Sequence, residues 1–171
     1  DDTNMPDLKD RIQAFQQAKA AEGMIRTGQV REGVAELLRL HRDYPESPAF
    51  VTWLAESLRD RPDAAADALP VVLEAGRNDR TPATARAEFL AWAGSASQAY
   101  DKPDEAHALL QEALVLDPAN ADIHIRMGLV LLPRGEAEAA VARFREAVSL
   151  APDQARAGVL LGLACLHAGQ T

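Results

Sequence analysis

Two ten-residue stretches of the chain are identical at five positions and begin 34 residues apart. EALVLDPANA runs from Glu112 to Ala121, and EAVSLAPDQA runs from Glu146 to Ala155. A period of this length indicates a supersecondary unit that cannot bury its apolar face alone and therefore stacks on its neighbours. The repeat predicts a stack of helix pairs.

The unit can be followed position by position in residues 87–120 and 121–154, which are 34 residues each. Small residues, a turn residue, a large apolar residue and a proline recur at fixed places. In the second unit they are Gly128 (position 8), Gly135 (15), Ala140 (20), Phe144 (24), Ala147 (27) and Pro152 (32). In the first they are Gly94, Asp101, Ala106, Leu110, Ala113 and Pro118. Small residues let two helices approach closely, glycine permits the turn between them, and proline follows a helix that it cannot continue.

This pattern resembles the tetratricopeptide repeat (TPR), a helix–turn–helix unit. The resemblance implies an all-α fold, an α-α superhelix or TPR-like solenoid of about nine helices, in four units plus a half unit. A low aromatic content of 5% is consistent with helices, and no run of alternating β-branched residues indicates a strand.

The resemblance divides the chain into a disordered lead-in and one solenoid. The lead-in is 1–6, and the single solenoid 7–171 consists of units 14–47, 48–86, 87–120, 121–154 and the partial unit 155–171. Unit 48–86 is degenerate, with helices expected near 49–60 and 63–76. Thr81 is the expected cap, and Pro82 the expected first residue, of a longer helix that reaches Tyr100. Because the partial unit stops after its turn glycine, Gly169, we expect the natural protein to be longer or this half unit to find a substitute partner.

Composition argues against nucleic acids and membranes. The net charge of −8 repels a phosphate backbone, and no cluster of Lys and Arg offers a local exception. No apolar run is long enough for a transmembrane segment. The expected partner is therefore a protein or peptide.

No pattern in the sequence indicates catalysis, a metal or a cofactor. The four histidines show no metal-ligand spacing, and no phosphate-binding or nucleophile motif is present. Cys165 is the only cysteine and occupies position 11 of the partial unit, where the family buries a residue against the second helix. We therefore expect no enzyme activity, and a buried structural thiol at Cys165.

Partners of TPR proteins usually lie in a concave groove lined by the first helices of successive units. The resemblance assigns the following residues to a partner-binding groove: Trp92, Ile125, Arg126, Leu129, Leu132, Val159, Leu163 and Leu166. For Trp92 the competing interpretation is a side chain packed against neighbouring helices. The C-terminal part of the groove is strongly apolar, and such a surface is normally covered.

Three different segments could cover this apolar surface. They are a partner's amphipathic helix or apolar peptide, a further part of the same polypeptide, or a second copy that associates through the C-terminal half repeat. The preferred function is a protein–protein interaction scaffold. The alternatives are a regulatory or substrate-presenting arm of a larger bacterial enzyme, and an envelope scaffold for pilus assembly, secretion or polysaccharide export. Abundant arginine and alanine with lysine only at Lys9, Lys19 and Lys102 suggest a GC-rich bacterial gene. A cytoplasmic location is favoured over a periplasmic one.

Overall fold

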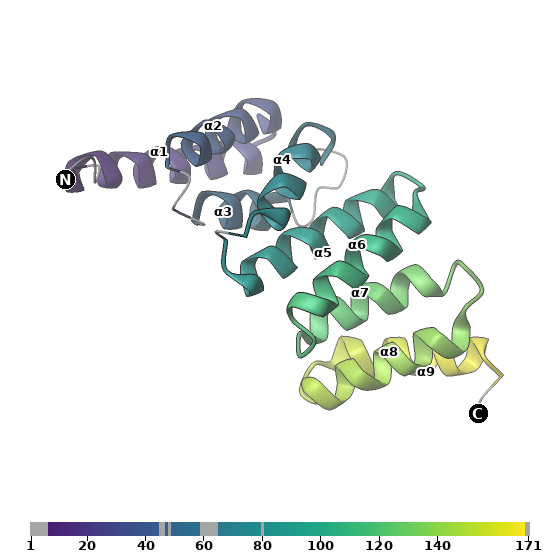
Figure 1. The fold of residues 1–171 in the computed structure, drawn as a ribbon. Helices are drawn as coiled ribbons and strands as arrows, with labels where there is room; N and C mark the ends of the chain where they lie inside the picture. Colours follow the sequence, from purple (N-terminus) through teal and green to yellow (C-terminus); the bar gives the residue numbers. More distant parts are fainter. Residues whose placement is uncertain (1–6, 45–46, 48, 59–64, 80, 170–171) are drawn as a thin grey trace. The chain divides into compact units, whose positions relative to one another are not determined.

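The computed structural model describes residues 7–44, 47, 49–58, 65–79 and 81–169, and the regular elements in these ranges are nine helices (Figure 1). They are α1 (Leu8–Arg26), α2 (Val30–Asp43), α3 (Ala49–Leu58), α4 (Ala65–Arg77), α5 (Ala83–Ala99), α6 (Pro103–Leu116), α7 (Ala121–Leu131), α8 (Ala137–Leu150) and α9 (Ala155–His167). The prediction of an all-α chain is confirmed, including the three helices expected between 49 and 100. The lead-in predicted for 1–6 lies outside the described residues.

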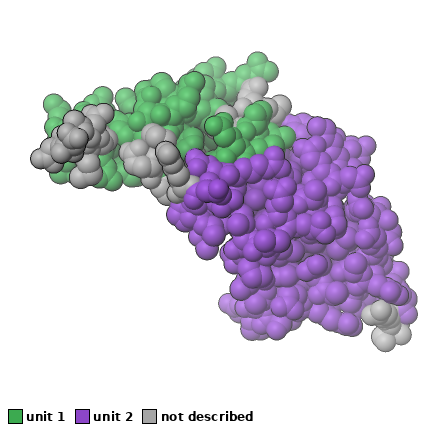
Figure 2. All heavy atoms as spheres, viewed as in Figure 1, with its two compact units in different colours: residues 1–75 green, residues 76–171 purple. Residues whose placement is uncertain are grey.

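The chain divides into two compact units, residues 1–75 and 76–171 (Figure 2). We describe each by itself. A single continuous solenoid over 7–171 stays a prediction.

In the first unit, α1, α2 and α3 pack against one another. The buried face of α1 consists of small residues, Ala14, Ala18 and Ala21, followed by Ile25. Gly33 on α2 lies so close that a β-carbon built there would be 2.6 Å from the carbonyl oxygen of Ala21. Small residues therefore set the short separation of these two helices, as the repeat predicts.

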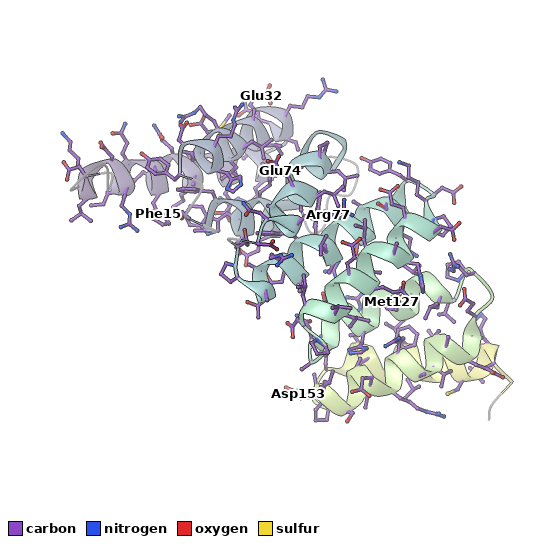
Figure 3. The ribbon with its side chains drawn as sticks, in the orientation of Figure 1. Phe15, Glu32, Glu74, Arg77, Met127 and Asp153 are labelled. Carbon is purple, nitrogen blue, oxygen red and sulfur yellow. The ribbon has the colours of Figure 1, made fainter. Side chains whose placement is uncertain are left out.

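An aromatic contact joins α1 to α3 in the same unit. Phe15 projects from α1 (Figure 3), and its ring centroid is 5.5 Å from that of Phe50 and 5.7 Å from that of Trp53. The edge-to-face arrangement with Trp53 is one that aromatic pairs prefer. These contacts hold together α1 and α3, the first helices of two successive repeats.

In the second unit, each helix from α5 to α9 packs on the next, and α5 also packs on α7. The two helix pairs repeat one contact. A β-carbon built at Gly94 would be 2.9 Å from Cγ of Leu110, and one built at Gly128 would be 2.5 Å from Cζ of Phe144. The large residue of each second helix thus rests directly on the glycine of the first helix.

The alanines on either side of this large residue are also part of the contact between the two helices. Ala106 and Ala113 flank Leu110, Ala140 and Ala147 flank Phe144, and all four alanines are fully buried. The sequence prediction that these are close-packing positions is confirmed by their burial.

The turn inside a unit is the same at three places. After α1, α5 and α7 the chain passes through a residue of positive φ: Gly28 (φ 101°), Asp101 (φ 58°) and Gly135 (φ 79°). At each turn two backbone hydrogen bonds close the helix end; after α5, Asp101 N donates to the Gln98 oxygen and Lys102 N to the Ser97 oxygen. This is the Schellman arrangement, in which a left-handed residue follows the helix cap. It explains the turn position that the repeat predicts.

Asp101 is the one described non-glycine residue with positive φ. A left-handed backbone costs an L-residue up to about 1–2 kcal/mol, although aspartate tolerates it better than most. We expect Asp101→Gly to raise the free energy of unfolding by up to about 1 kcal/mol. Urea unfolding of the two proteins at neutral pH measures the difference. Asp101→Ala, which keeps a β-carbon, should destabilise, and a gain from Ala equal to that from Gly would contradict the explanation.

Candidate protein-binding surface

The C-terminal helix α9 carries a row of exposed apolar side chains. Val159, Leu163 and Leu166 are 64%, 47% and 67% exposed. Residues spaced by four and three positions lie on one face of a helix. We call these three residues the α9 strip. The face of α9 toward α8 buries only Ala157 and Ala164, so most of the large side chains of the helix face away from the core.

Two residues predicted to line the groove lie in the core instead. Ile125 on α7 is 0% exposed, and Trp92 on α5 is 5% exposed. Because α5 packs directly on α7, first helices of neighbouring units cover positions that would otherwise face a groove. Neither side chain can contact a partner in this structure, and for Trp92 the packed interpretation holds.

The remaining predicted residues on α7 are intermediate in exposure. Leu129 and Leu132 are partly buried. Arg126 is also partly buried, with 20% of its side chain exposed, and it is held within the protein. Of the eight predicted groove residues, only the α9 strip is well exposed.

Hydrogen bonds between polar groups connect α5 to α7 close to the predicted groove residues of α7. Arg126 Nε donates to Asp122 Oδ2 at 2.6 Å, and its Nη1 donates to Ser95 Oγ at 2.6 Å. Gln98 Nε2 donates to the carbonyl oxygen of Leu129 at 3.0 Å. The sequence assigned Arg126 to a partner and did not predict its hydrogen bond to Ser95, or that of Gln98 to Leu129. The place of Ser95 and Gln98 at positions 9 and 12 of the preceding unit was the signal that they would face Arg126 and Leu129.

A second exposed apolar face occurs on α1 and was not predicted. Leu8, Ile12 and Phe15 are all exposed, and they have the same spacing as the α9 strip. The sequence LKDRIQAF shows that spacing, but most of it precedes Ala14, where the repeat begins, so the repeat pattern does not predict this face. Phe15 is partly covered by Phe50 and Trp53, whereas Leu8 and Ile12 extend beyond that contact.

The titratable groups do not converge on a centre in the part of the chain that the structure describes. No three His, Cys, Asp or Glu side chains gather there in a way that would hold a metal ion. Burial lowers the pKa of His41 on α2, and the carboxylate of Glu74 opposes the shift. The Cys165 thiol is half-buried, less covered than its repeat position predicts. None of the described helices has the length and hydropathy needed to cross a bilayer.

Comparison with known proteins gives matches of structure alone. No protein family and no curated protein matches the sequence. The crystal structure of the MamA protein matches with a TM-score of 0.66 and 23% identity, over 92% of this chain and 83% of that one. A thermophilic TPR protein of Thermus thermophilus matches with a TM-score of 0.61 and 20% identity, over 92% of this chain and 84% of that one.

A subunit of the Cut9-Hcn1 hetero-tetramer of the APC/C also matches, with a TM-score of 0.66 and 18% identity over 88% of this chain and 29% of that one. At these identities the likeness establishes the fold and no more. It agrees with the glycine-on-large-residue contacts and the left-handed turns described above. The chain therefore has the TPR-like fold, an all-α superhelix of helix–turn–helix units.

Proposed function

We propose that this protein is a protein–protein interaction scaffold that binds an amphipathic helix or apolar peptide of a partner on the α9 strip. The observation that carries the proposal is the exposure of Val159, Leu163 and Leu166 on one face of α9. Removing apolar surface from water is favourable by about 25 cal/mol per Å². Three aligned side chains of this size therefore supply a driving force for association, and their helical spacing suits a helix or an extended apolar segment.

The charge of the protein supports a protein partner over a nucleic acid. The net charge is −8, which opposes binding to a phosphate backbone. We propose no catalytic activity for the chain, because its sequence contains no phosphate-binding or nucleophile motif. The interpretations as an arm of a larger bacterial enzyme or as an envelope scaffold differ in the partner and not in the surface that binds it.

Affinity capture from the source organism, with a control that places a glutamate elsewhere on the surface, tests the proposal. The bait proteins are the unchanged chain, a Leu163→Glu, Leu166→Glu variant and a Val115→Glu variant. Val115 is 82% exposed on α6, so it introduces a glutamate on an exposed apolar residue away from the strip. Circular dichroism first establishes that all three have equal helical content.

We expect a partner that is retained by the unchanged chain and by Val115→Glu and is lost by the double variant. If all three baits retain the same proteins, the α9 strip is not the binding surface. Light scattering separates the case of a second copy. Concentration-dependent association of the unchanged chain, abolished in the double variant, would show that the strip binds another copy and would contradict a foreign partner.

A further inference from the structure

The exposed apolar face of α1 forms one narrow row along the helix. It consists of Leu8, Ile12 and Phe15, which we call the α1 strip, and Leu8 and Ile12 are 70% and 52% exposed. Successive residues of a helix are about 100° apart around its axis, so these three side chains fall within about 60° of one another. They form a continuous apolar surface two turns long.

One end of the α1 strip rests on a fixed aromatic cluster. Phe15 (Figure 3) lies 5.5 Å from Phe50 and 5.7 Å from Trp53 between ring centroids, and Phe50 lies 5.9 Å from Tyr44. A ring that is already held by its neighbours loses little further freedom when a partner binds. Aromatic side chains also supply much of the binding energy at many protein interfaces. The Phe15 end of the strip is therefore a suitable anchor for a partner.

The α1 strip faces the side of α1 on which α3 packs, because Phe15 belongs to the strip and contacts Phe50 and Trp53 on α3. In a stack of repeats the two neighbours of a unit lie on opposite sides of it. A repeat placed before α1 would therefore pack away from α3, on the side of α1 where Gln13 and Gln17 lie. Such a repeat would leave the strip open.

The charged residues around the α1 strip are mostly basic. Residues 8–19 of α1 contain Lys9, Asp10, Arg11 and Lys19, all of them exposed. Arg11 is four residues before Phe15 and Lys19 is four residues after it, so both are neighbours of the strip on the helix surface. Asp10 lies on the far side of the helix. The strip thus has a basic rim, although the net charge of the protein is −8.

We infer that the α1 strip is a second interaction surface, which binds an acidic amphipathic helix of a partner protein. Arg11 and Lys19 are separated by about 12 Å along the axis of α1. The partner helix would place apolar residues spaced by three and four positions over the strip, with carboxylates at two places about 12 Å apart. Apolar burial drives the contact, and the charge pairs fix its orientation.

A second copy of the chain fits the charge of this surface less well. Two strips that overlap about a two-fold axis would bring Arg11 of one copy next to Arg11 of the other, because this residue lies beside the middle of the strip. Like charges at such a contact oppose association. An anionic membrane would attract the basic rim, but it would repel the remainder of a protein with a net charge of −8. An acidic protein segment avoids both costs.

The probe is a capped, designed helical peptide of alanine, leucine and glutamate. Its leucines are spaced by four and three positions, and its glutamates flank them on both sides. A control peptide has the same leucines and has lysine in place of each glutamate. Binding to the full chain is measured by fluorescence anisotropy, and we expect the acidic peptide to bind about tenfold more tightly than the basic one. The net charge of the protein by itself would give the opposite order.

Variants of the full chain locate the contact. Ile12→Gln removes apolar surface from the middle of the strip and should weaken binding of the acidic peptide about tenfold. The double variant Arg11→Gln, Lys19→Gln should weaken it about fivefold and should lose the preference for the acidic peptide. Arg42→Gln, Arg145→Gln is the matched control, because both arginines are exposed on other helices and the net charge changes equally. It should bind as the unchanged chain does.

The inference is overturned if the acidic peptide does not bind, if the basic peptide binds as tightly, or if Ile12→Gln leaves the affinity unchanged. Three other results would identify a different occupant and would also overturn it. Concentration-dependent association that Ile12→Gln abolishes would identify a second copy. Sedimentation with phosphatidylserine vesicles that Ile12→Gln abolishes would identify a membrane. A gain in peptide affinity of about tenfold in an Asp1→Asn, Asp2→Asn variant would identify the chain's own N-terminal segment.

This inference goes beyond the proposed function and is tested separately from it. The Leu163→Glu, Leu166→Glu variant should still bind the acidic peptide, because the α1 strip is intact in it. Loss of peptide binding in that variant would place the contact on α9 and would reject the α1 strip as the site. The capture experiment on the α9 strip is decided by its own baits in either case.

Discussion

Phe144→Ala should lower the free energy of unfolding by about 3–5 kcal/mol. Phe144 is fully buried, and its ring rests on the backbone of Gly128, with the β-carbon position of that glycine 2.5 Å from Cζ. Removing the ring leaves a cavity that glycine cannot fill, because it has no side chain to move into the space. The loss therefore combines the transfer free energy of the ring with the cost of the cavity.

Urea unfolding monitored by circular dichroism measures this change. Val115→Ala is the control, because Val115 is 82% exposed and surface substitutions of this kind usually change stability by less than about 0.5 kcal/mol. A loss below about 1.5 kcal/mol for Phe144→Ala would mean that the α7–α8 contact does not contribute to the core as described.

Gly128→Ala has the second-largest expected effect, a loss of about 1–3 kcal/mol. Its new methyl group would collide with a fixed aromatic ring and not with the end of a flexible chain. Gly162→Ala is the matched substitution at the same repeat position, but there the methyl group meets nothing within 4 Å. Alanine is the better helix former, so Gly162→Ala should stabilise by about 0.5–1 kcal/mol.

The opposite signs of these two changes test the packing argument against helix propensity alone, which would make both substitutions stabilising. A Gly128→Ala, Phe144→Ala double variant adds a further check by the same unfolding measurement. The methyl group then partly fills the space left by the ring, so the two losses should sum to more than the loss of the double variant. Strict additivity would show that the residues do not act on each other.

The repeat predicted the parts of the fold that depend on contacts inside one unit. Gly128 must be small because Phe144 lies above it, and Asp101 must take a left-handed backbone because it occupies the turn position of Gly135. Both constraints are local, so a single unit contains the information.

The exposure of the groove residues depends on contacts between units, which the repeat does not specify. Ala91, Ile125 and Val159 share one repeat position, yet the first two are buried and the third is 64% exposed. The difference comes from the helices that pack around α5 and α7. How far a neighbouring first helix covers its predecessor depends on the angle and separation of the two helices. The repeat therefore could not predict the burial of Ile125, and it left the surface and packed interpretations of Trp92 open.

The small buried face of α9 affects how stably this helix stays folded. Ala157 and Ala164 are the buried residues of this helix, and α8 is the helix on which it chiefly packs. In a linear array each element derives its stability largely from its neighbours, so a helix with so little buried surface has a low free energy of local opening. A ligand that binds only the closed form shifts that opening equilibrium toward order. In the proposed function, binding at α9 and the ordering of α9 are therefore coupled, and part of the binding free energy would go into holding the helix closed.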